Sequence, residues 1–165
     1  MTTGKNLQSW LALHLVPGMG PVTCNKLVAH FGSPEKVFSA SISELTAVCR
    51  LRRESLVALD NKGKKSLTEL AGNEIKRATE KNITIIDCDD PLYPSLLKNI
   101  HDPPVVLYVL GKPEVLNCKG IGIVGSRAAT HSGRSIAEQM ANSLVRQGFT
   151  IISGMALGVD TAAHK

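Results

Sequence analysis

The sequence predicts an α/β fold in which a small helical domain (residues 1–82) precedes the first part of a parallel-sheet domain (residues 83–165). Two observations lead to this prediction. Up to about residue 82 the apolar residues recur at helical spacing, whereas beyond it short apolar runs alternate with helical stretches. Within the second part, residues 121–152 have the pattern strand, helix, strand, which is typical of a right-handed βαβ unit with parallel strands.

Six helices are predicted in the first part. The stretch from Pro17 to Pro21 separates the first helix from the second, and Pro21 suits a first helical turn. Gly32 ends the second helix, and Ser33 followed by Pro34 begins the third. The predicted helices cover residues 6–15, 21–31, 34–40, 43–49, 52–60 and 64–81.

Strands and helices alternate in the second part. Short apolar runs predict strands at residues 83–87, 105–110, 121–124 and 149–152. The third run is continuous, as in a sheet that is covered on both faces. A further helix begins near Val159. Between the last two strands an amphipathic helix is predicted over residues 132–147, with an apolar face formed by Ile136, Met140, Leu144 and Val145.

Composition and charge indicate a soluble globular protein with unevenly placed charge. Apolar residues make up 43% and charged residues 20% of the chain, and the formal net charge is +5. Residues 50–81 carry nine Lys or Arg against five Asp or Glu, and residues 119–165 carry five against two. Two such basic blocks could follow a phosphate backbone. A basic stretch like residues 50–81 is also typical of a solvated helical face.

The cysteines and the apolar runs indicate in which cellular compartment the protein is found. Four cysteines are scattered without the paired spacing of a zinc site or a disulfide scaffold. The longest apolar run, residues 105–110, is far too short to span a bilayer, and no signal-like segment follows Met1. We therefore expect a cytoplasmic protein that has no metal site and does not contact a membrane.

Two loops are the candidates for a ligand site. Gly125-Ser126-Arg127 directly follows strand 121–124, and residues 153–158 directly follow strand 149–152. Ligands of open α/β sheets bind at the carboxyl ends of strands, and parallel neighbouring strands would set these loops side by side. Backbone amides, serine hydroxyls and a guanidinium are donors suited to phosphate. The sequence thus predicts a phosphate site formed by Gly125, Ser126, Arg127, Ser153, Gly154 and Met155.

A dinucleotide site is not indicated. Residues 120–125 match the pattern G-x-G-x-x-G, but the match lies inside a strand and does not connect a strand to a helix. No acidic residue ends the second strand, where a ribose-binding carboxylate would be needed. We therefore expect no cofactor.

The turn at residues 15–20 resembles a helix-hairpin-helix motif. In such motifs a glycine turn presents backbone amides to a DNA phosphate without reading the base sequence. Gly18 and Gly20 are the candidate contacts. The same kind of turn also serves as a plain packing corner in small helical domains.

Taken together, these stretches resemble the DprA/Smf family of DNA-processing proteins. The resemblance rests on residues 125–134, residues 153–164, the connecting residues 93–108 and the turn at residues 17–20. It implies a SAM-like or helix-hairpin-helix domain joined to an extended Rossmann-like domain. It further implies a protein without enzymatic activity that binds and protects single-stranded DNA, loads the RecA recombinase in natural transformation, and forms a homodimer when complete.

The resemblance also assigns roles to residues. Arg127 would hold a phosphate, which the remaining residues of the two loops would surround. Many relatives have a basic residue where this chain has Leu157, so one phosphate contact is expected to be missing. The base pocket and dimer surface of the family lie further downstream. The sequence is therefore expected to be the incomplete front part of a longer protein.

An enzyme is the alternative interpretation. Asp160 and His164 are an acid and a base one helical turn apart, but no nucleophile or metal-ligand set accompanies them, and no catalytic residue is assigned. Asp160 also suits the start of a helix, where its charge interacts favourably with the helix dipole. A phosphoribohydrolase of the lysine-decarboxylase-like type would begin with a similar glycine-serine loop. Its G-G-x-G-T stretch does not occur in these 165 residues.

Overall fold

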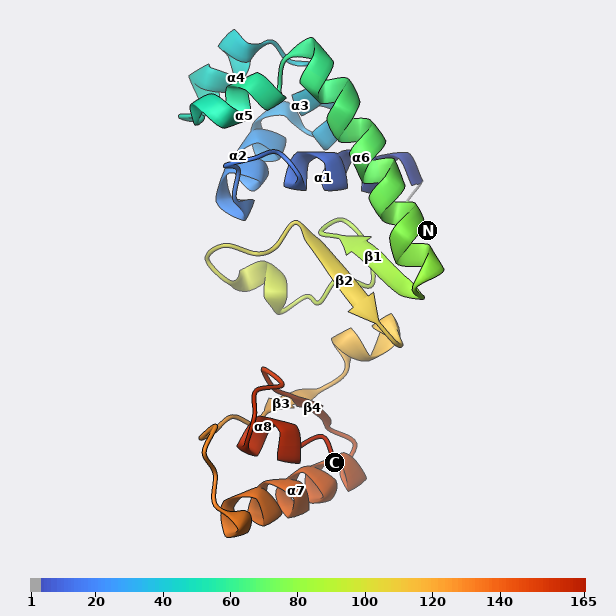
Figure 1. The fold of residues 1–165 in the computed structure, drawn as a ribbon, viewed down its shortest axis with the longest axis vertical. Coiled ribbons are helices and arrows are strands. Elements are labelled where there is room, and N and C mark those ends of the chain that lie inside the picture. Colours follow the sequence, from blue (N-terminus) through green and yellow to red (C-terminus); the bar gives the residue numbers. More distant parts are fainter. Residues whose placement is uncertain (1–3) are drawn as a thin grey trace. The chain divides into compact units, whose positions relative to one another are not determined.

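The computed structural model describes the backbone of residues 4–165 and the side chains of residues 6–165. The chain forms two compact units (Figure 1), the first ending at Pro113 and the second covering Glu114–Lys165. Each unit has a hydrophobic core of its own.

Side-chain caps determine where several helices of the first unit begin. Ser33 caps α3 (Pro34–Ser39), Ser41 and Glu44 form a capping box on α4 (Ile42–Val48), and Asp60 caps α6 (Asn61–Glu80). The six predicted helices are confirmed, and α6 begins before residue 64 because the Asp60 carboxylate accepts a hydrogen bond from the backbone amide three residues later. The helices are α1 (Gly4–His14), α2 (Pro21–Phe31), α3 (Pro34–Ser39), α4 (Ile42–Val48), α5 (Arg53–Ala58) and α6 (Asn61–Glu80).

Two strands complete the first unit. β1 (Ile83–Asp87) and β2 (Val106–Leu110) pair antiparallel, with Ile83 opposite Leu110, and β1 packs against α1 and α6. Ile85 therefore belongs to the same buried core as residues of the helices. The connecting segment contains a short 3₁₀ turn (Leu97–Asn99) and is joined to α1 by the Trp10 indole, which donates to the Asp89 carboxylate at 2.8 Å.

Residues 83–110 pack against the helices that precede them and belong to the same compact unit. The sequence pattern changes near residue 82, but the compact unit continues to Pro113 because β1 buries its apolar face on the helical core. A domain boundary near residue 82 stays a prediction about the organisation of the protein. In this structure β1 and β2 form a sheet separate from the parallel one.

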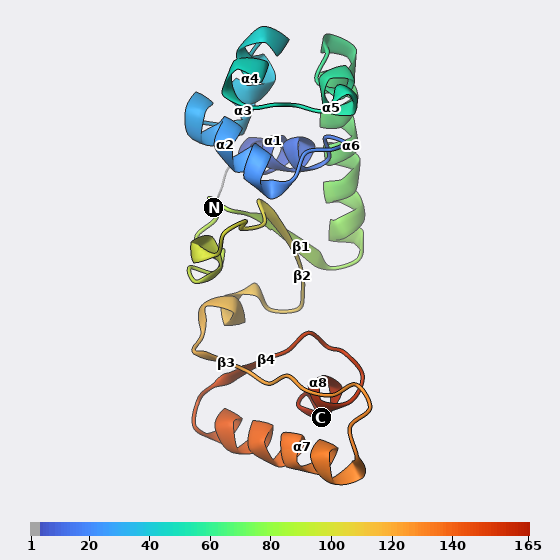
Figure 2. The ribbon, with the colours of Figure 1, turned by 90° about the vertical axis from the view of Figure 1, so that its left-hand side faces the viewer.

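The second unit is built around a parallel strand pair. β3 (Gly120–Gly122) pairs with β4 (Thr150–Ile152), and α7 (His131–Arg146) connects them. The βαβ pattern predicted from the sequence is thus confirmed. A 3₁₀ turn (Pro113–Asn117) precedes β3, and α8 (Val159–Ala162) follows β4. Helix α7 packs against both β4 and α8, and Figure 2 shows it passing along one side of this unit.

The buried face of α7 differs from the predicted one. Ala137 and Ala141 are buried and Leu144 packs on the core, whereas Ile136 and Met140 are 63% and 57% exposed. Of the predicted apolar face only Leu144 contacts the core, since Val145 is also exposed. The alanines, which have short side chains, allow the helix backbone to approach β4 and α8 closely. The prediction favoured the larger apolar residues and was wrong for that reason.

The buried carboxyl group of Asp87 leads to a prediction about how the stability of the first unit depends on pH. Its side chain is fully buried, Oδ1 accepts a hydrogen bond from the Asp89 amide at 2.9 Å, and Oδ2 has no partner among the described residues. Burial raises the pKa of the Asp87 carboxyl above its ordinary value, and the nearby Asp89 and Asp90 carboxylates act in the same direction. The folded state therefore binds the proton more tightly than the unfolded state does.

The expected stabilisation by this proton is complete below the unfolded-state pKa of about 3.9 and is lost as the pH rises through the higher folded-state pKa. Asp87→Asn should remove this dependence, so that the variant gains stability relative to the wild type as the pH approaches neutrality. Urea unfolding followed by the fluorescence of Trp10, the one tryptophan in the chain, measures this. The exposed Asp102→Asn is the control, and a stability difference for Asp87→Asn that does not vary with pH would contradict the expectation.

Candidate functional site

The two predicted loops lie at the same edge of the parallel strand pair. The Ile123 amide donates to the Ile152 carbonyl at 2.9 Å, which is the last hydrogen bond between the two strand segments. Directly beyond it the chain enters Gly125-Ser126-Arg127 on one side and Ser153-Gly154-Met155 on the other. The structure therefore brings all six residues of the predicted phosphate site to one end of β3 and β4.

One carboxylate ties these loops together. Asp160 is 95% buried, with a relative exposure of 5%, in the first turn of α8. Its Oδ1 accepts from the Gly125 amide at 3.3 Å and its Oδ2 accepts from the Gly154 amide at 3.0 Å. Asp160 does stand at a helix start, as the sequence predicts. Its bonds to the two loops could not be predicted from the sequence, because no local pattern indicates which distant amides a carboxylate reaches.

The bonds to Asp160 change the expected roles of the two glycines. The Gly125 and Gly154 amides already have an acceptor, so they organise the loops and are not free to donate to an anion in this arrangement. At Gly125 a side chain would collide with Val159, which means that the glycine allows α8 to pack directly on the loop. The outward donors of the first loop are the exposed side chains of Ser126 and Arg127.

Gly158 fixes the contact between the second loop and the first. Its φ of +92° lies in the region that L residues rarely adopt, and a Cβ there would collide with the Ser126 carbonyl oxygen. The next residue, Val159, donates its amide to that same carbonyl at 3.2 Å. The Ser126 peptide therefore rests directly on the start of α8, which holds the first loop in a defined conformation.

The serine hydroxyls and the arginine are the polar groups left at the surface of the loops. Ser126 Oγ accepts from the Ala128 amide at 3.2 Å, and Ser153 Oγ accepts from the Met155 amide at 3.0 Å. The Ser126 hydroxyl keeps its own proton for another acceptor, whereas Ser153 Oγ also lies 2.9 Å from His164 Nε2. Arg127 takes part in neither of the ion pairs found within residues 6–165, so its guanidinium is available to an external anion.

An open cavity of about 410 Å³ adjoins the second loop within the same unit. It lies between α7 and the start of α8, and its charged and titratable side chains are mostly basic. The exposed Leu157 lines it, at the position where the family resemblance would expect a basic residue. The charged and titratable side chains that line this cavity are His131, Arg134, Glu138 and Lys165.

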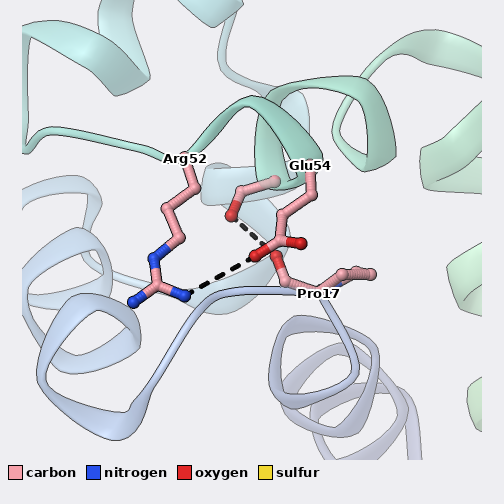
Figure 3. Close-up of polar contacts among 4 residues, drawn as sticks. Pro17, Arg52 and Glu54 are labelled. Carbon is pink, nitrogen blue, oxygen red and sulfur yellow. Dashed lines mark hydrogen bonds and ion pairs between the residues drawn. The ribbon is translucent and has the colours of Figure 1, made fainter.

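The glycine turn of the first unit is closely packed on α5. The Ser55 hydroxyl donates to the Pro17 carbonyl at 2.7 Å, and the Glu54 carboxylate lies beside Gly18, whose φ is +73°. Arg52 approaches Glu54 at 3.7 Å in an exposed ion pair (Figure 3). A phosphate next to Gly18 would have to displace a carboxylate of the same charge.

Gly20 of the same turn differs from Gly18. It is the N-cap residue of α2, and a side chain placed there would meet no atom within 4 Å. The space beside Gly20 is therefore open, and the contact predicted for these two glycines stays a prediction.

Within residues 6–165, no three His, Cys, Asp or Glu side chains gather as a metal site would require. No helix in the described part of the chain combines the length and the apolar character needed to cross a membrane.

The fold and the loops define a class of protein: a helical unit is followed by an α/β unit with paired glycine-serine loops at its strand ends. The family described as DNA recombination-mediator protein A matches residues 84–165. "Protein Smf" of Synechocystis sp. is 34% identical over 94% of this chain and 39% of its own length. "DNA processing protein DprA" of Bacillus subtilis is 39% identical over 52% of this chain and 29% of its own length. The chain belongs to the DprA/Smf family.

A solved structure agrees with this assignment at the level of the fold. The X-ray structure of DNA processing protein A (DprA) from Streptococcus pneumoniae matches with a TM-score of 0.63 at 23% identity. It covers 94% of this chain, and this chain covers 52% of it. The predicted α/β class, with helices, small sheets and a parallel strand pair, is thereby confirmed. The chain spans between about a third and a half of the lengths of these relatives.

Proposed function

We propose that this chain binds single-stranded DNA through its phosphates and serves in DNA uptake and recombination. The observation that carries the proposal is the loop pair at the ends of β3 and β4, which Asp160 holds together and which presents Arg127 without an ion-pair partner within residues 6–165. The names of its relatives, DNA processing protein and DNA recombination-mediator protein, support the same role.

The chemistry of the loops favours phosphate over base recognition. A guanidinium and serine hydroxyls are donors, and the cavity beside the second loop adds Arg134 and Lys165. Donors of this kind fix a strand by its backbone and carry no sequence information. With 4% aromatic residues in the chain, base stacking on aromatic rings contributes little. We therefore propose binding with little sequence preference.

The family membership suggests partners for the whole protein. We propose that the complete protein forms a homodimer, protects incoming strands without enzymatic turnover, and delivers them to the RecA recombinase. The support for this part is the family assignment. The proposed phosphate site, in contrast, lies within the part of the chain that the structure describes.

Salt titration tests the proposal. The affinity for a labelled oligothymidylate should fall linearly on a log–log scale, with a slope of about −0.7 for each phosphate neutralised. Fluorescence anisotropy at several salt concentrations between about 50 and 200 mM measures the slope. A duplex of the same length is the matched control and should bind more weakly. Equal affinity for the duplex, or an affinity that does not change with salt, would contradict the proposal.

A further inference from the structure

Ser153 and His164 form a hydrogen bond at the proposed phosphate site. Ser153 Oγ lies 2.9 Å from His164 Nε2 and also accepts from the Met155 amide at 3.0 Å. Ser153 directly follows β4, and His164 lies just beyond α8, so the contact joins the second loop to the end of the following helix. Asp160, one helical turn before His164, instead bonds the two glycine amides.

The hydrogen atoms available to this pair limit what Ser153 can do. A hydroxyl has one proton to donate and two lone pairs that accept. The Met155 amide occupies one lone pair. If His164 Nε2 carries no hydrogen, it can only accept, and the single hydroxyl proton is used on it. If Nε2 carries a hydrogen, it donates to Oγ, and the hydroxyl proton becomes available to another acceptor.

We infer that His164 is a positioning residue that decides whether the Ser153 hydroxyl can donate to a bound phosphate. The inference rests on the proposed function, since it places a phosphate at this loop. A phosphate oxygen and an unprotonated Nε2 compete for the same hydroxyl proton. Phosphate binding and a hydrogen on Nε2 therefore favour each other, and this coupling is reciprocal.

A neutral imidazole carries its single hydrogen on either nitrogen, whereas a protonated imidazole always carries one on Nε2. Protonation therefore removes the form in which Nε2 accepts, and the coupling has a pH dependence. The charged groups that line a cavity together with His164 are Glu138 of α7 and the adjacent Lys165. Asp160, one helical turn before His164, directs its carboxylate to the Gly125 and Gly154 amides. Carboxylates and ammonium groups ordinarily keep their charge between pH of about 5.5 and 8.5, whereas histidine changes its charge in this range. His131, at the start of α7, is the other histidine of the second unit and needs a control.

The test is the pH profile of oligothymidylate affinity at constant ionic strength. The wild type should bind about three- to tenfold more tightly at pH 5.5 than at pH 8.5, as expected for one hydrogen bond gained. His164→Gln carries an amide that can donate to Oγ at every pH and should give a flat profile, as should Ser153→Ala. His131→Gln should keep the wild-type profile. An unchanged profile in His164→Gln, or a flat one in His131→Gln, would overturn the inference.

An NMR titration of the His164 ring separates hydrogen bonding from general charge attraction. Adding oligothymidylate should move the Nε2 resonance of His164 toward that of a nitrogen that carries a hydrogen in the wild type, and much less in Ser153→Ala. Equal movement in both proteins would mean that the charge of the strand acts through space, and the inference would fail.

The same measurements distinguish a failure of the role of His164 from a failure of the proposed function. Salt-dependent binding with a flat pH profile would overturn the role of His164 and leave the phosphate site standing. Absence of binding at every pH would overturn both.

Discussion

Arg127→Ala is expected to weaken the binding of single-stranded DNA by about 1–3 kcal/mol and to leave the fold intact. The size is that of a charge-assisted hydrogen bond. The fold should survive because Arg127 is exposed and belongs to no ion pair within residues 6–165. Anisotropy titration with oligothymidylate measures the loss of affinity, and the circular dichroism melting curve checks the fold.

A matched control and a conservative variant sharpen this test. Arg146 is also exposed and ends α7, about 22 Å along the helix from its start, so Arg146→Ala removes the same charge away from the loops. It should lower the affinity much less. Arg127→Lys should restore only part of the loss, because an ammonium group cannot reproduce a two-pronged hydrogen bond. If both Arg127 variants bind like the wild type, the phosphate site lies elsewhere.

Asp160→Asn is expected to destabilise the second unit by about 1–3 kcal/mol, the cost of a buried donor left unpaired. An asparagine keeps one oxygen, so only one of the Gly125 and Gly154 amides retains its acceptor, and the other faces an amide group that also donates. Hydrogen exchange of the β3 and β4 amides measures the effect within this unit. Glu138→Gln, at an exposed acid of α7, is the control and should leave the exchange rates unchanged.

The sign of the change in DNA affinity of Asp160→Asn distinguishes two roles of this carboxylate. Removing a negative charge near a phosphate would by itself raise the affinity. We expect the affinity to fall, because the loops lose the bond that holds them at the ends of β3 and β4. A variant that is as stable as the wild type and binds DNA more tightly would show that Asp160 acts only through its charge.

Local signals in the sequence predicted most of the elements and both loops. Caps such as Ser33 and Asp60 act within one helical turn, so the order of residues specifies them directly. The position of the two loops also followed from the sequence, since each directly follows an apolar strand and the strands were predicted to be parallel neighbours.

Features that depend on distant partners could not be predicted. The pairing of β1 with β2, and the burial of Ile85 on the helical core, depend on which surfaces meet. The same holds for the face of α7 that is buried, because its alanines are selected by the space available against β4. The two bonds of Asp160 are the clearest case, since a carboxylate in a first helical turn is usually assigned to the helix dipole.

The two hydrogen bonds of Asp160 also differ greatly in their separation along the chain. The bond to Gly154 spans 6 residues, whereas the bond to Gly125 spans 35 and encloses all of α7. Closing the longer loop costs more chain entropy, so we expect the bond to Gly125 to form after the bond to Gly154. The second loop can therefore become ordered on its own, while the first loop is locked only once the α7 crossover has docked. A phosphate-binding surface that needs both loops is thus among the last parts of this unit to mature during folding.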